Sequence, residues 1–536
     1  MSDNEESYDV VVVGSGGGGL VSAYIAASRG LRTLVIEKTD QVGGTTSYSG
    51  AGLWFPGSAP TKRAGIDDSD VEVARGYLRK AVDDPGRESM QDAYLSAGAR
   101  LIDELERNPW FQSFEHQPVP DYLDHLEGAT PHGRTVFPPP IAVSDVGDRA
   151  ALVRKSIYTE RYDHSEDEML LGGRALIARA LSAFLETGNG VLELDTALTD
   201  LVVENGRIVG VDAVCDGATV RYGAARGVLL AAGGFEHNAE LRAKYGTIPA
   251  NADWSDGVDS NVGDALVAGL AVGAATDLMD EAWYVPGTVQ PDGKPVFQTG
   301  IRGGIWVNGS GERFVNELRP YDQAGHTIRD GERTEEGSHA PAYWVFDHKA
   351  FVRDGFGGKS PEVPVAAEWF ESGALKKADT LEELAEQIGV PAAALIDSVS
   401  TFNGYVDGGV DEQFHRGESA WDQMFQFIVG YPALPEQNFV VPLPPEGPNP
   451  LLTGTDTPPY YAATILLSDI GTKGGLKTDP NARVLQADGQ PIGGLYATGN
   501  TMAAMSGKVY PGAGTPIGSS LAFGYLAVLD MADATS

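Results

Sequence analysis

The sequence predicts an α/β protein in which a Rossmann-like domain is interrupted by an inserted α+β domain. A strand–helix–strand pattern with a glycine-rich turn runs from Asp9 to Lys38. Two further strand patterns that end in glycine, around residue 230 and after residue 490, suit the same sheet. The chain has 536 residues, more than one hydrophobic core usually serves, so we expect two domains.

The first strand–helix–strand unit carries a nucleotide-binding signature. Gly14, Gly16 and Gly19 fit G-x-G-x-x-G between an apolar run and a helical stretch. In this motif the first glycine makes a tight turn, the second lets backbone approach a pyrophosphate, and the third brings helix against strand. Glu37 ends the next β-branched run, where an acid accepts hydrogen bonds from an adenosine ribose. Together these features predict dinucleotide binding, although the glycines alone also suit a plain turn.

The stretch that follows this acid favours FAD over NAD. It reads "VGGTTSYSGAGLWFPG" from Val42 to Gly57, with small residues and hydroxyls typical of flavoproteins, and a surface loop is the alternative. The later strand patterns close on Gly233 and in "GLYATGN", where glycine permits close backbone approach to a ligand. A second G-x-G-x-x-G for NAD is missing from the sequence, so electrons are expected from the substrate itself or from a separate carrier.

The spacing of these signals predicts the domain organisation. We place an FAD-binding domain at residues 1–280 and 457–536 and an inserted substrate domain at 281–456. Within the insertion, Asn308-Gly309 is a turn signal that predicts a strand–turn–strand unit. Thr380 and Glu383 form a capping box before one helix, and Pro391 starts the next.

Composition and charge exclude several classes of function. There are 39 basic and 75 acidic residues, and the net charge of -36 repels nucleic acids and anionic lipid surfaces. Cys215 is the only cysteine, which suits a reducing cytoplasm. No apolar run approaches the roughly 18 residues of a membrane span, and the sequence lacks metal-protease, nucleophile-elbow and P-loop motifs. We expect a soluble cytoplasmic protein without a metal.

The stretch "MSGKVYPGAGTPIGSS" near the C-terminus predicts how a substrate is held. Lys508 is its only charged residue, and it offers the Tyr510 phenol and the Gly514 backbone N–H. These chain segments resemble the FAD-dependent fumarate reductase and succinate dehydrogenase superfamily, whose dicarboxylate enzymes carry an arginine here. A hydroxyl and an amide are instead partners for a neutral carbonyl oxygen that gains negative charge. The stretch therefore predicts that the site polarises a ketone.

More specifically, the sequence resembles the 3-ketosteroid Δ1-dehydrogenases over most of its length. The matching motifs are "VGSGGGG", "GGTTSYSGAGLWFPG", "PDY" at Pro120–Tyr122, "NELRPYDQ" at Asn316–Gln323, "LSDIGTKGGL" at Leu467–Leu476 and "YPGAG" at Tyr510–Gly514.

The resemblance implies a mechanism and partners. Tyr510 and Gly514 N–H would bind the C3 carbonyl of a steroid ketone, while Tyr321, aided by Tyr122, takes the proton from C2 and flavin N5 accepts hydride from C1. An external acceptor, a quinone or an artificial dye, would reoxidise the flavin. The predicted cofactor-binding residues are Gly14, Gly16, Gly17, Gly18, Gly19, Glu37, Lys38, Gly43, Gly44, Thr45, Thr46, Ser47, Gly50, Ala51, Gly52, Ala232, Gly233, Asp264, Gly499, Asn500, Gly514, Pro516 and Ile517.

The sequence alone leaves other functions and residue roles open. A Δ4-dehydrogenase of 5α-reduced 3-ketosteroids needs the same carbonyl clamp, and Tyr122 favours Δ1 only weakly. A fumarate-reductase-like enzyme is disfavoured because the C-terminal arginine is missing. A flavin-bearing binding or electron-transfer module would make the tyrosines incidental. Arg313 in "GERFVNE" suits a buried ion pair slightly better than a catalytic role, and Asp264 suits a helix cap as well as a flavin contact.

Overall fold

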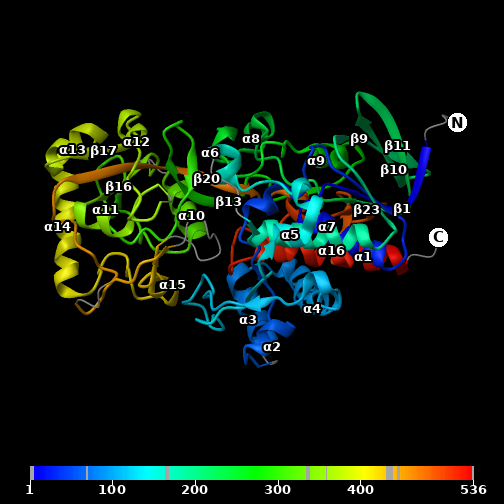
Figure 1. Cartoon of the computed structure of the whole chain (residues 1–536), viewed down its shortest axis with the longest axis horizontal. Coiled ribbons are helices and arrows are strands. Elements are labelled where there is room, and N and C mark those ends of the chain that lie inside the picture. The colour runs from blue at the N-terminus through cyan, green and yellow to red at the C-terminus, as the bar shows by residue number, and fades with distance from the viewer. Residues whose placement is uncertain are drawn as a thin grey trace. The chain divides into compact units, whose positions relative to one another are not determined.

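The computed structural model describes residues 5–67, 70–162, 168–332, 339–357, 359–429, 439–443 and 447–533. The chain forms two compact units (Figure 1). Unit 1 consists of Met1–Ala250, Gly257–Ala282 and Gly471–Ser536, and unit 2 of Asn251–Asp256 and Trp283–Ile470. The mixed α/β class is confirmed. The domain boundaries near 280 and 457 stay a prediction.

Unit 1 is built on an eight-stranded sheet in the order β22-β23-β10-β11-β1-β2-β8, with β9 paired to β10. The strands are β1 (Glu5–Val13), β2 (Thr33–Ile36), β8 (Gly190–Glu193), β9 (Thr196–Glu204), β10 (Arg207–Cys215), β11 (Ala218–Leu230), β22 (Arg483–Leu485) and β23 (Pro491–Ala497). β8, β2, β1, β11 and β23 run parallel, so their carboxyl ends share one edge.

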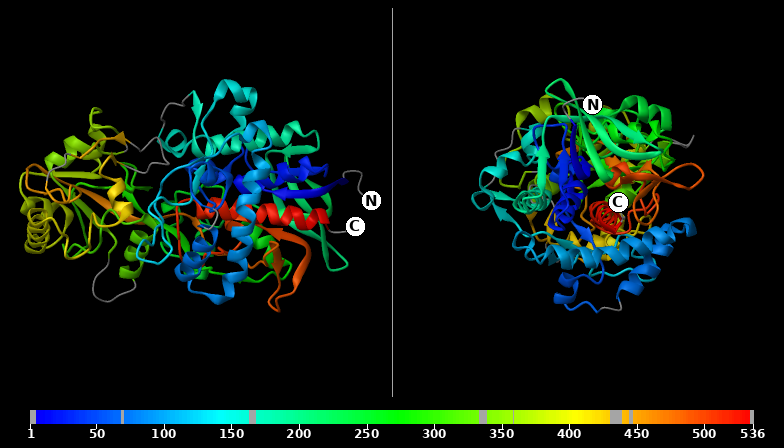
Figure 2. Two further views of the ribbon diagram at one scale, coloured as in Figure 1. Left: turned by 90° about the horizontal axis from the view of Figure 1, so that it is seen from below. Right: turned by 90° about the vertical axis from the view of Figure 1, so that its right-hand side faces the viewer.

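Burial explains why the first motif forms a central strand. Val10 to Val13 are all buried, as expected for a parallel strand covered on both faces. Helix α1 (Gly17–Ser28) follows, and it packs against α7 (Gly172–Glu186) and α16 (Thr515–Asp533). α16, drawn in red, runs beside the blue α1 in both views of Figure 2. The start and the end of the chain thus build one layer.

A smaller part of unit 1 carries the chain between β2 and α7. Helices α3 (Asp70–Val82) and α4 (Glu88–Leu105) pack together, and β3 (Leu53–Trp54), β5 (Thr135–Phe137) and β4 (Glu115–His116) form a three-stranded sheet. α4 buries one apolar face, as an amphipathic helix that serves packing does.

Unit 2 has an α+β architecture with a second sheet, whose strand order is β14-β13-β20-β16-β15, and β17 pairs with β20. The strands are β13 (Ala282–Val289), β14 (Pro295–Phe297), β15 (Ile305–Val307), β16 (Ala342–Phe346), β17 (Leu375–Ala378) and β20 (Tyr460–Thr472). Thr380 caps α13 (Leu381–Ile388) as predicted, with its Oγ1 accepting from Glu383 N–H at 3.2 Å. α14 (Ala392–Gly408) begins directly after Pro391.

The strand–turn–strand unit expected at Asn308-Gly309 is confirmed only in part. β15 is followed by a turn, in which Gly311 N–H donates to Asn308 O at 2.9 Å. The run after the turn makes only an isolated antiparallel bridge between Val307 and Arg313, and β15 pairs with β16 instead. The Arg313 side chain enters a buried ion cluster.

The acid surplus lies mainly at the surface. Only a minority of the acidic side chains in the described ranges is buried. Every helix in these ranges is too short or too polar to cross a bilayer. No group of histidine, cysteine or acidic side chains in the same ranges could hold a metal ion.

We therefore expect the unfolding temperature to rise with KCl concentration. Between about 0.1 M and 1 M the screening length falls from about 10 Å to about 3 Å, which weakens the self-repulsion of a compact chain of net charge -36. Thermal unfolding of the flavin-bound protein measures this. Sucrose at matched osmolarity is the control for solute exclusion, and an unfolding temperature that stays level or falls with KCl would contradict the prediction.

Candidate active site

The glycine motif forms an open cradle at the carboxyl edge of the unit 1 sheet. Gly14 has φ +99°, and a Cβ there would lie 2.5 Å from the carbonyl oxygen of Ala231, so the turn requires glycine. At Gly19 a Cβ would lie 2.1 Å from Gly14 O, which explains the close packing of helix on strand. A Cβ at Gly16 would meet nothing nearer than Thr46 Oγ1 at 3.8 Å. The space over Gly16 therefore suits an extended phosphate-bearing ligand.

Glu37 is held rigidly beside this cradle. Its Oε2 accepts from Ser15 Oγ at 2.6 Å and from Ser15 N–H at 3.1 Å. Its Oε1 accepts from the N–H and the Oγ1 of Thr39, both at 3.0 Å. The carboxylate is thus fixed at the end of β2, next to the glycine turn.

Asp264 does not cap the helix that it opens. The N-cap of α9 (Asp264–Ala271) is Gly263, which makes no side-chain cap. The Asp264 carboxylate instead pairs with Lys38 Nζ at 2.6 Å, which ties the start of α9 to the residue after Glu37.

The segment after Glu37 wraps the start of α1. Thr46 Oγ1 accepts from Gly17 N–H at 3.0 Å, and Gly43 N–H donates to Ser15 Oγ at 3.2 Å. Ser47 Oγ is buried and has no hydrogen-bond partner among the described residues. The small residues predicted here therefore line the motif, and one hydroxyl is available to a ligand.

The other glycine-ended strands reach the same edge. Thr501 Oγ1 donates to Gly233 O at 2.8 Å, and Thr498 N–H donates to Leu230 O at 2.9 Å. These bonds join the end of β11 to the 3₁₀ turn η6 (Gly499–Thr501), which contains Asn500. The structure thus brings Ala232 beside Gly14 and Asn500 beside Gly234, at the carboxyl ends of parallel strands.

The loop with Tyr510 brings its hydroxyl next to a backbone N–H. Gly514 N–H donates to Tyr510 Oη at 3.3 Å, and Tyr510 is buried. Gly514 has φ +88°, and a Cβ there would lie 2.2 Å from the carbonyl carbon of Gly52. The Tyr122 ring is 5.1 Å from the Tyr510 ring. Tyr510, Gly514 and Tyr122 therefore meet in unit 1, against the segment at Gly52, and Pro516 and Ile517 follow in the first turn of α16.

Side chains from distant segments hold this loop through its carbonyl oxygens. Arg87 Nη1 donates to Ala504 O at 3.0 Å, and Lys473 Nζ donates to Lys508 O at 2.6 Å. Thr135 Oγ1 donates to Ala513 O at 2.7 Å. Lys508, the charge noted in the sequence, pairs with the buried Glu281 at 3.1 Å. The sequence did not identify these donors, because a side chain that bonds to a remote carbonyl leaves no motif.

Tyr321 is the first residue of α10 (Tyr321–Glu332) in unit 2. It is buried, and the Phe297 ring lies edge-on to it at 4.9 Å.

Just before this helix stands a buried ion cluster. Arg313 bonds to Glu317 at 2.8 and 3.0 Å and to Asp411 at 2.9 and 2.7 Å. Arg416 Nη1 adds a bond to Glu317 at 3.1 Å. The guanidinium of Arg313 therefore makes structural ion pairs, which supports the ion-pair interpretation of the sequence. The cluster also fixes the chain at Glu317, four residues before Tyr321.

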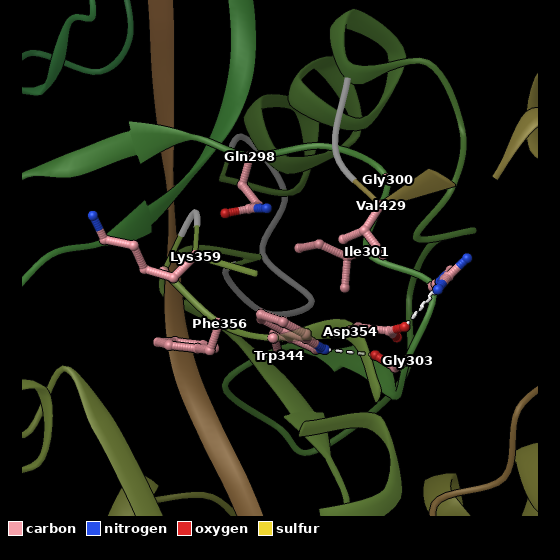
Figure 3. A pocket seen from close by; sticks show the side chains of 12 residues that line it. Gln298, Gly300, Ile301, Gly303, Trp344, Asp354, Phe356, Lys359 and Val429 are labelled. Carbon is pink, nitrogen blue, oxygen red and sulfur yellow. Dashed lines mark hydrogen bonds and ion pairs between the residues drawn. The ribbon is translucent and has the colours of Figure 1, made fainter. Parts of the chain in front are cut away.

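A separate pocket lies within unit 2 (Figure 3). Gln298, Ile301 and Trp344 are among its lining residues. Arg302 pairs with Asp354 at 2.8 Å, and Trp344 Nε1 donates to Gly303 O at 2.7 Å, so these polar groups satisfy one another. None of the predicted catalytic or cofactor-binding residues lines this pocket. It is not the candidate active site.

Four large aromatic side chains at the end of β3 and at the start of β13 are buried: Trp54, Phe55, Trp283 and Tyr284. Trp54 and Phe55 belong to the core of unit 1, where they pack on Tyr77 and Tyr94. In unit 2, Tyr284 packs edge-on against His326. These contacts favour core packing for at least these three residues.

Comparisons with known proteins identify the family of the chain. The model of the FAD binding domain family matches residues 9–517. The chain is 38% identical to 3-oxosteroid 1-dehydrogenase of Mycobacterium tuberculosis (strain ATCC 25618 / H37Rv), over 98% of this chain and 99% of the relative. The enzyme of the same name from Mycolicibacterium smegmatis (strain ATCC 700084 / mc(2)155) is 38% identical over 98% of this chain and 97% of its own.

A solved structure gives the same result. The crystal structure of 3-ketosteroid delta1-dehydrogenase from Sterolibacterium denitrificans, in complex with 1,4-androstadiene-3,17-dione, superposes with a TM-score of 0.87. Identity is 33%, and the match covers 98% of this chain and 99% of the other. The open space at Gly16 and the partnerless Ser47 hydroxyl fit FAD, which is the cofactor. The chain is an FAD-dependent oxidoreductase that belongs to the FAD-binding flavoproteins and, within them, to the family of 3-oxosteroid 1-dehydrogenases.

Proposed function

We propose that this enzyme introduces a double bond between C1 and C2 of a 3-ketosteroid. The observation that carries the proposal is the contact of Tyr510 Oη with Gly514 N–H, which donates to that oxygen at 3.3 Å. A hydroxyl and an amide N–H side by side can both donate to one carbonyl oxygen placed against them, whereas a carboxylate substrate would need a cation there. The names of the relatives support the same substrate class.

Four groups divide the proposed chemistry. Tyr510 and Gly514 N–H hold the C3 oxygen and stabilise the negative charge that acidifies the C2–H bond. Tyr321 takes the C2 proton and Tyr122 assists it, the roles that the family resemblance implies. A phenol with a pKa of about 10 is protonated at neutral pH and is therefore a poor base. A hydrogen bond from a second phenol would help it to accept the proton.

We assign the FAD contacts to residues that line the glycine-motif cradle. Glu37 would accept hydrogen bonds from the ribose, Gly16 and the start of α1 would face the pyrophosphate, and the segment from Gly43 to Gly52 would run along the flavin. When bound, FAD supplies the acceptor for the hydride from C1. A quinone or another external carrier then takes the electrons. The single, half-buried Cys215 suits the reducing cytoplasm in which we place the enzyme.

Mass analysis of steroid products tests this proposal. A 3-ketosteroid that already contains the C4–C5 double bond is incubated with the enzyme and an artificial electron acceptor. We expect its mass to fall by two hydrogens, with the new double bond at C1–C2. The matched substrate is the 5α-reduced 3-ketone, which is the only one of the two that a Δ4-dehydrogenase can oxidise. Conversion of that compound alone, to the 4-ene, would overturn the proposal in favour of the Δ4 enzyme.

The same assay addresses the other readings. Fumarate reduction by the reduced enzyme, without steroid conversion, would indicate the fumarate-reductase-like alternative. A flavin that no ketosteroid bleaches under anaerobic conditions would indicate a binding module. Androstane-like and cholestane-like ketones, compared side by side, would define the preferred side chain.

A further inference from the structure

A buried hydroxyl links the chain at Tyr122 to the loop that carries Tyr510. Tyr77 lies on α3 and is fully buried. Its Oη donates to Pro511 O at 2.5 Å and accepts from Leu123 N–H at 3.2 Å. One hydroxyl therefore joins the residue after Tyr122 to the residue after Tyr510.

The same carbonyl oxygen receives a second bond from this part of the site. Tyr122 N–H donates to Pro511 O at 3.0 Å. The two phenol rings are tilted by 55° with their centroids 5.1 Å apart. Two bonds to Pro511 O thus support the spacing of Tyr122 from Tyr510, and the Tyr77 side chain supplies one of them.

Charged groups hold Tyr77 in place. Asp70, at the start of α3, accepts from Arg134 at 2.6 and 2.8 Å. Arg134 also binds Asp121, the residue before Tyr122, and its guanidinium lies 5.9 Å from the centre of the Tyr77 ring. Both sides of the Tyr77–Leu123 bond are therefore anchored to one arginine.

Electrostatics keep the Tyr77 hydroxyl protonated. Burial, together with the nearby Asp121 carboxylate, raises the pKa of Tyr77 well above its usual range. A neutral phenol can donate to one partner and accept from another at the same time, which the Pro511–Leu123 bridge requires. The bridge therefore persists at any working pH of the enzyme.

We propose that Tyr77 is a positioning residue whose hydroxyl sets the separation of Tyr122 from the Tyr510–Gly514 donor pair. The inference rests on the proposed function, which gives these groups their roles. Without the hydroxyl, Leu123 N–H loses its acceptor and the two phenols can shift against each other. Misplacement of a catalytic group by about 1 Å lowers rates by about 10²-fold.

The test is Tyr77→Phe in the flavin-bound enzyme, with kcat expressed per bound flavin so that misfolded protein does not count. We expect kcat for a 3-ketosteroid to fall about 10- to 100-fold with little change in KM. The matched control is Tyr496→Phe. It also removes a buried hydroxyl in unit 1, one that donates to Asp530 at 2.7 Å, and it should leave kcat unchanged.

A double-mutant cycle with Tyr122→Phe separates positioning from simple structural weakening. Because Tyr77 acts through Tyr122 and its neighbours, the double variant should lose less than the product of the two single losses. An unchanged kcat in Tyr77→Phe, or losses that multiply, would overturn the positioning role. Those outcomes leave the proposed function standing if Tyr510→Phe is impaired, whereas a fully active Tyr510→Phe overturns the proposed function itself.

Discussion

Tyr510→Phe is expected to lower the turnover of a 3-ketosteroid by about 10²- to 10³-fold, the usual effect of removing one donor from a developing oxyanion. The ring is buried among side chains that phenylalanine can equally contact, and Gly514 N–H remains as the second donor. The folded enzyme should therefore stay yellow. The loss should appear in kcat and in kcat/KM alike, since the hydroxyl acts mainly on the charged transition state.

Anaerobic mixing with substrate measures this step directly, because the flavin bleaches only when the steroid is oxidised. Tyr8→Phe is a matched control, since Tyr8 is also buried in unit 1 and its hydroxyl donates to Glu6 at 2.7 Å. Bleaching by Tyr510→Phe at the wild-type rate would remove the phenol from the mechanism.

Tyr321→Phe should have an equal or larger effect, about 10²- to 10⁴-fold on turnover, because it removes the proposed proton acceptor. The Phe297 contact and the preceding ion cluster do not involve the hydroxyl, so α10 should remain folded. Steady-state rates with a substrate deuterated at C2 provide the measurement. The residual reaction should show a larger isotope effect than that of the wild type if proton removal has become the slow step.

The control for this variant comes from the same unit. Tyr461 is buried on β20, and its hydroxyl lies 3.3 Å from His348 Nδ1. Tyr461→Phe should keep the wild-type rate and isotope effect. If Tyr321→Phe turned over normally, another group would have to take the C2 proton.

The first half of the cofactor cradle could be predicted because its signals are local. Gly14 and Gly19 stand where a Cβ would clash, and Gly16 leaves space open for a ligand. All three lie in one short motif, and Glu37 directly follows the next strand, β2. The meeting of distant strand ends was predictable for a related reason, since parallel strands place their carboxyl ends together. These residues keep their predicted place in the structure, while their contacts with FAD stay a prediction.

Other features depended on long-range contacts that no local pattern records. The run after Asn308 was expected to form a strand, but it makes a single bridge, and its Arg313 side chain pairs with Asp411 far along the chain. Asp264 reads as a helix cap in sequence, yet its partner is Lys38. Tyr77 looks like an ordinary apolar-face residue of α3, and its bond to Pro511 spans 434 positions. In each case the partner lies far along the chain, so the sequence around the residue does not reveal it.

The order of the chain has a consequence for biosynthesis. The central sheet of unit 1 needs β23, and α1 is covered by α16, so neither the sheet nor its helical layer can be completed before residues 491–533 have left the ribosome. Unit 2, apart from residues 251–256, is one continuous stretch that emerges earlier. Because domains tend to fold as they emerge, we expect the insertion to fold first. The N-terminal strands would complete their sheet only after β23 has been synthesised. Cofactor loading would then be a post-translational event.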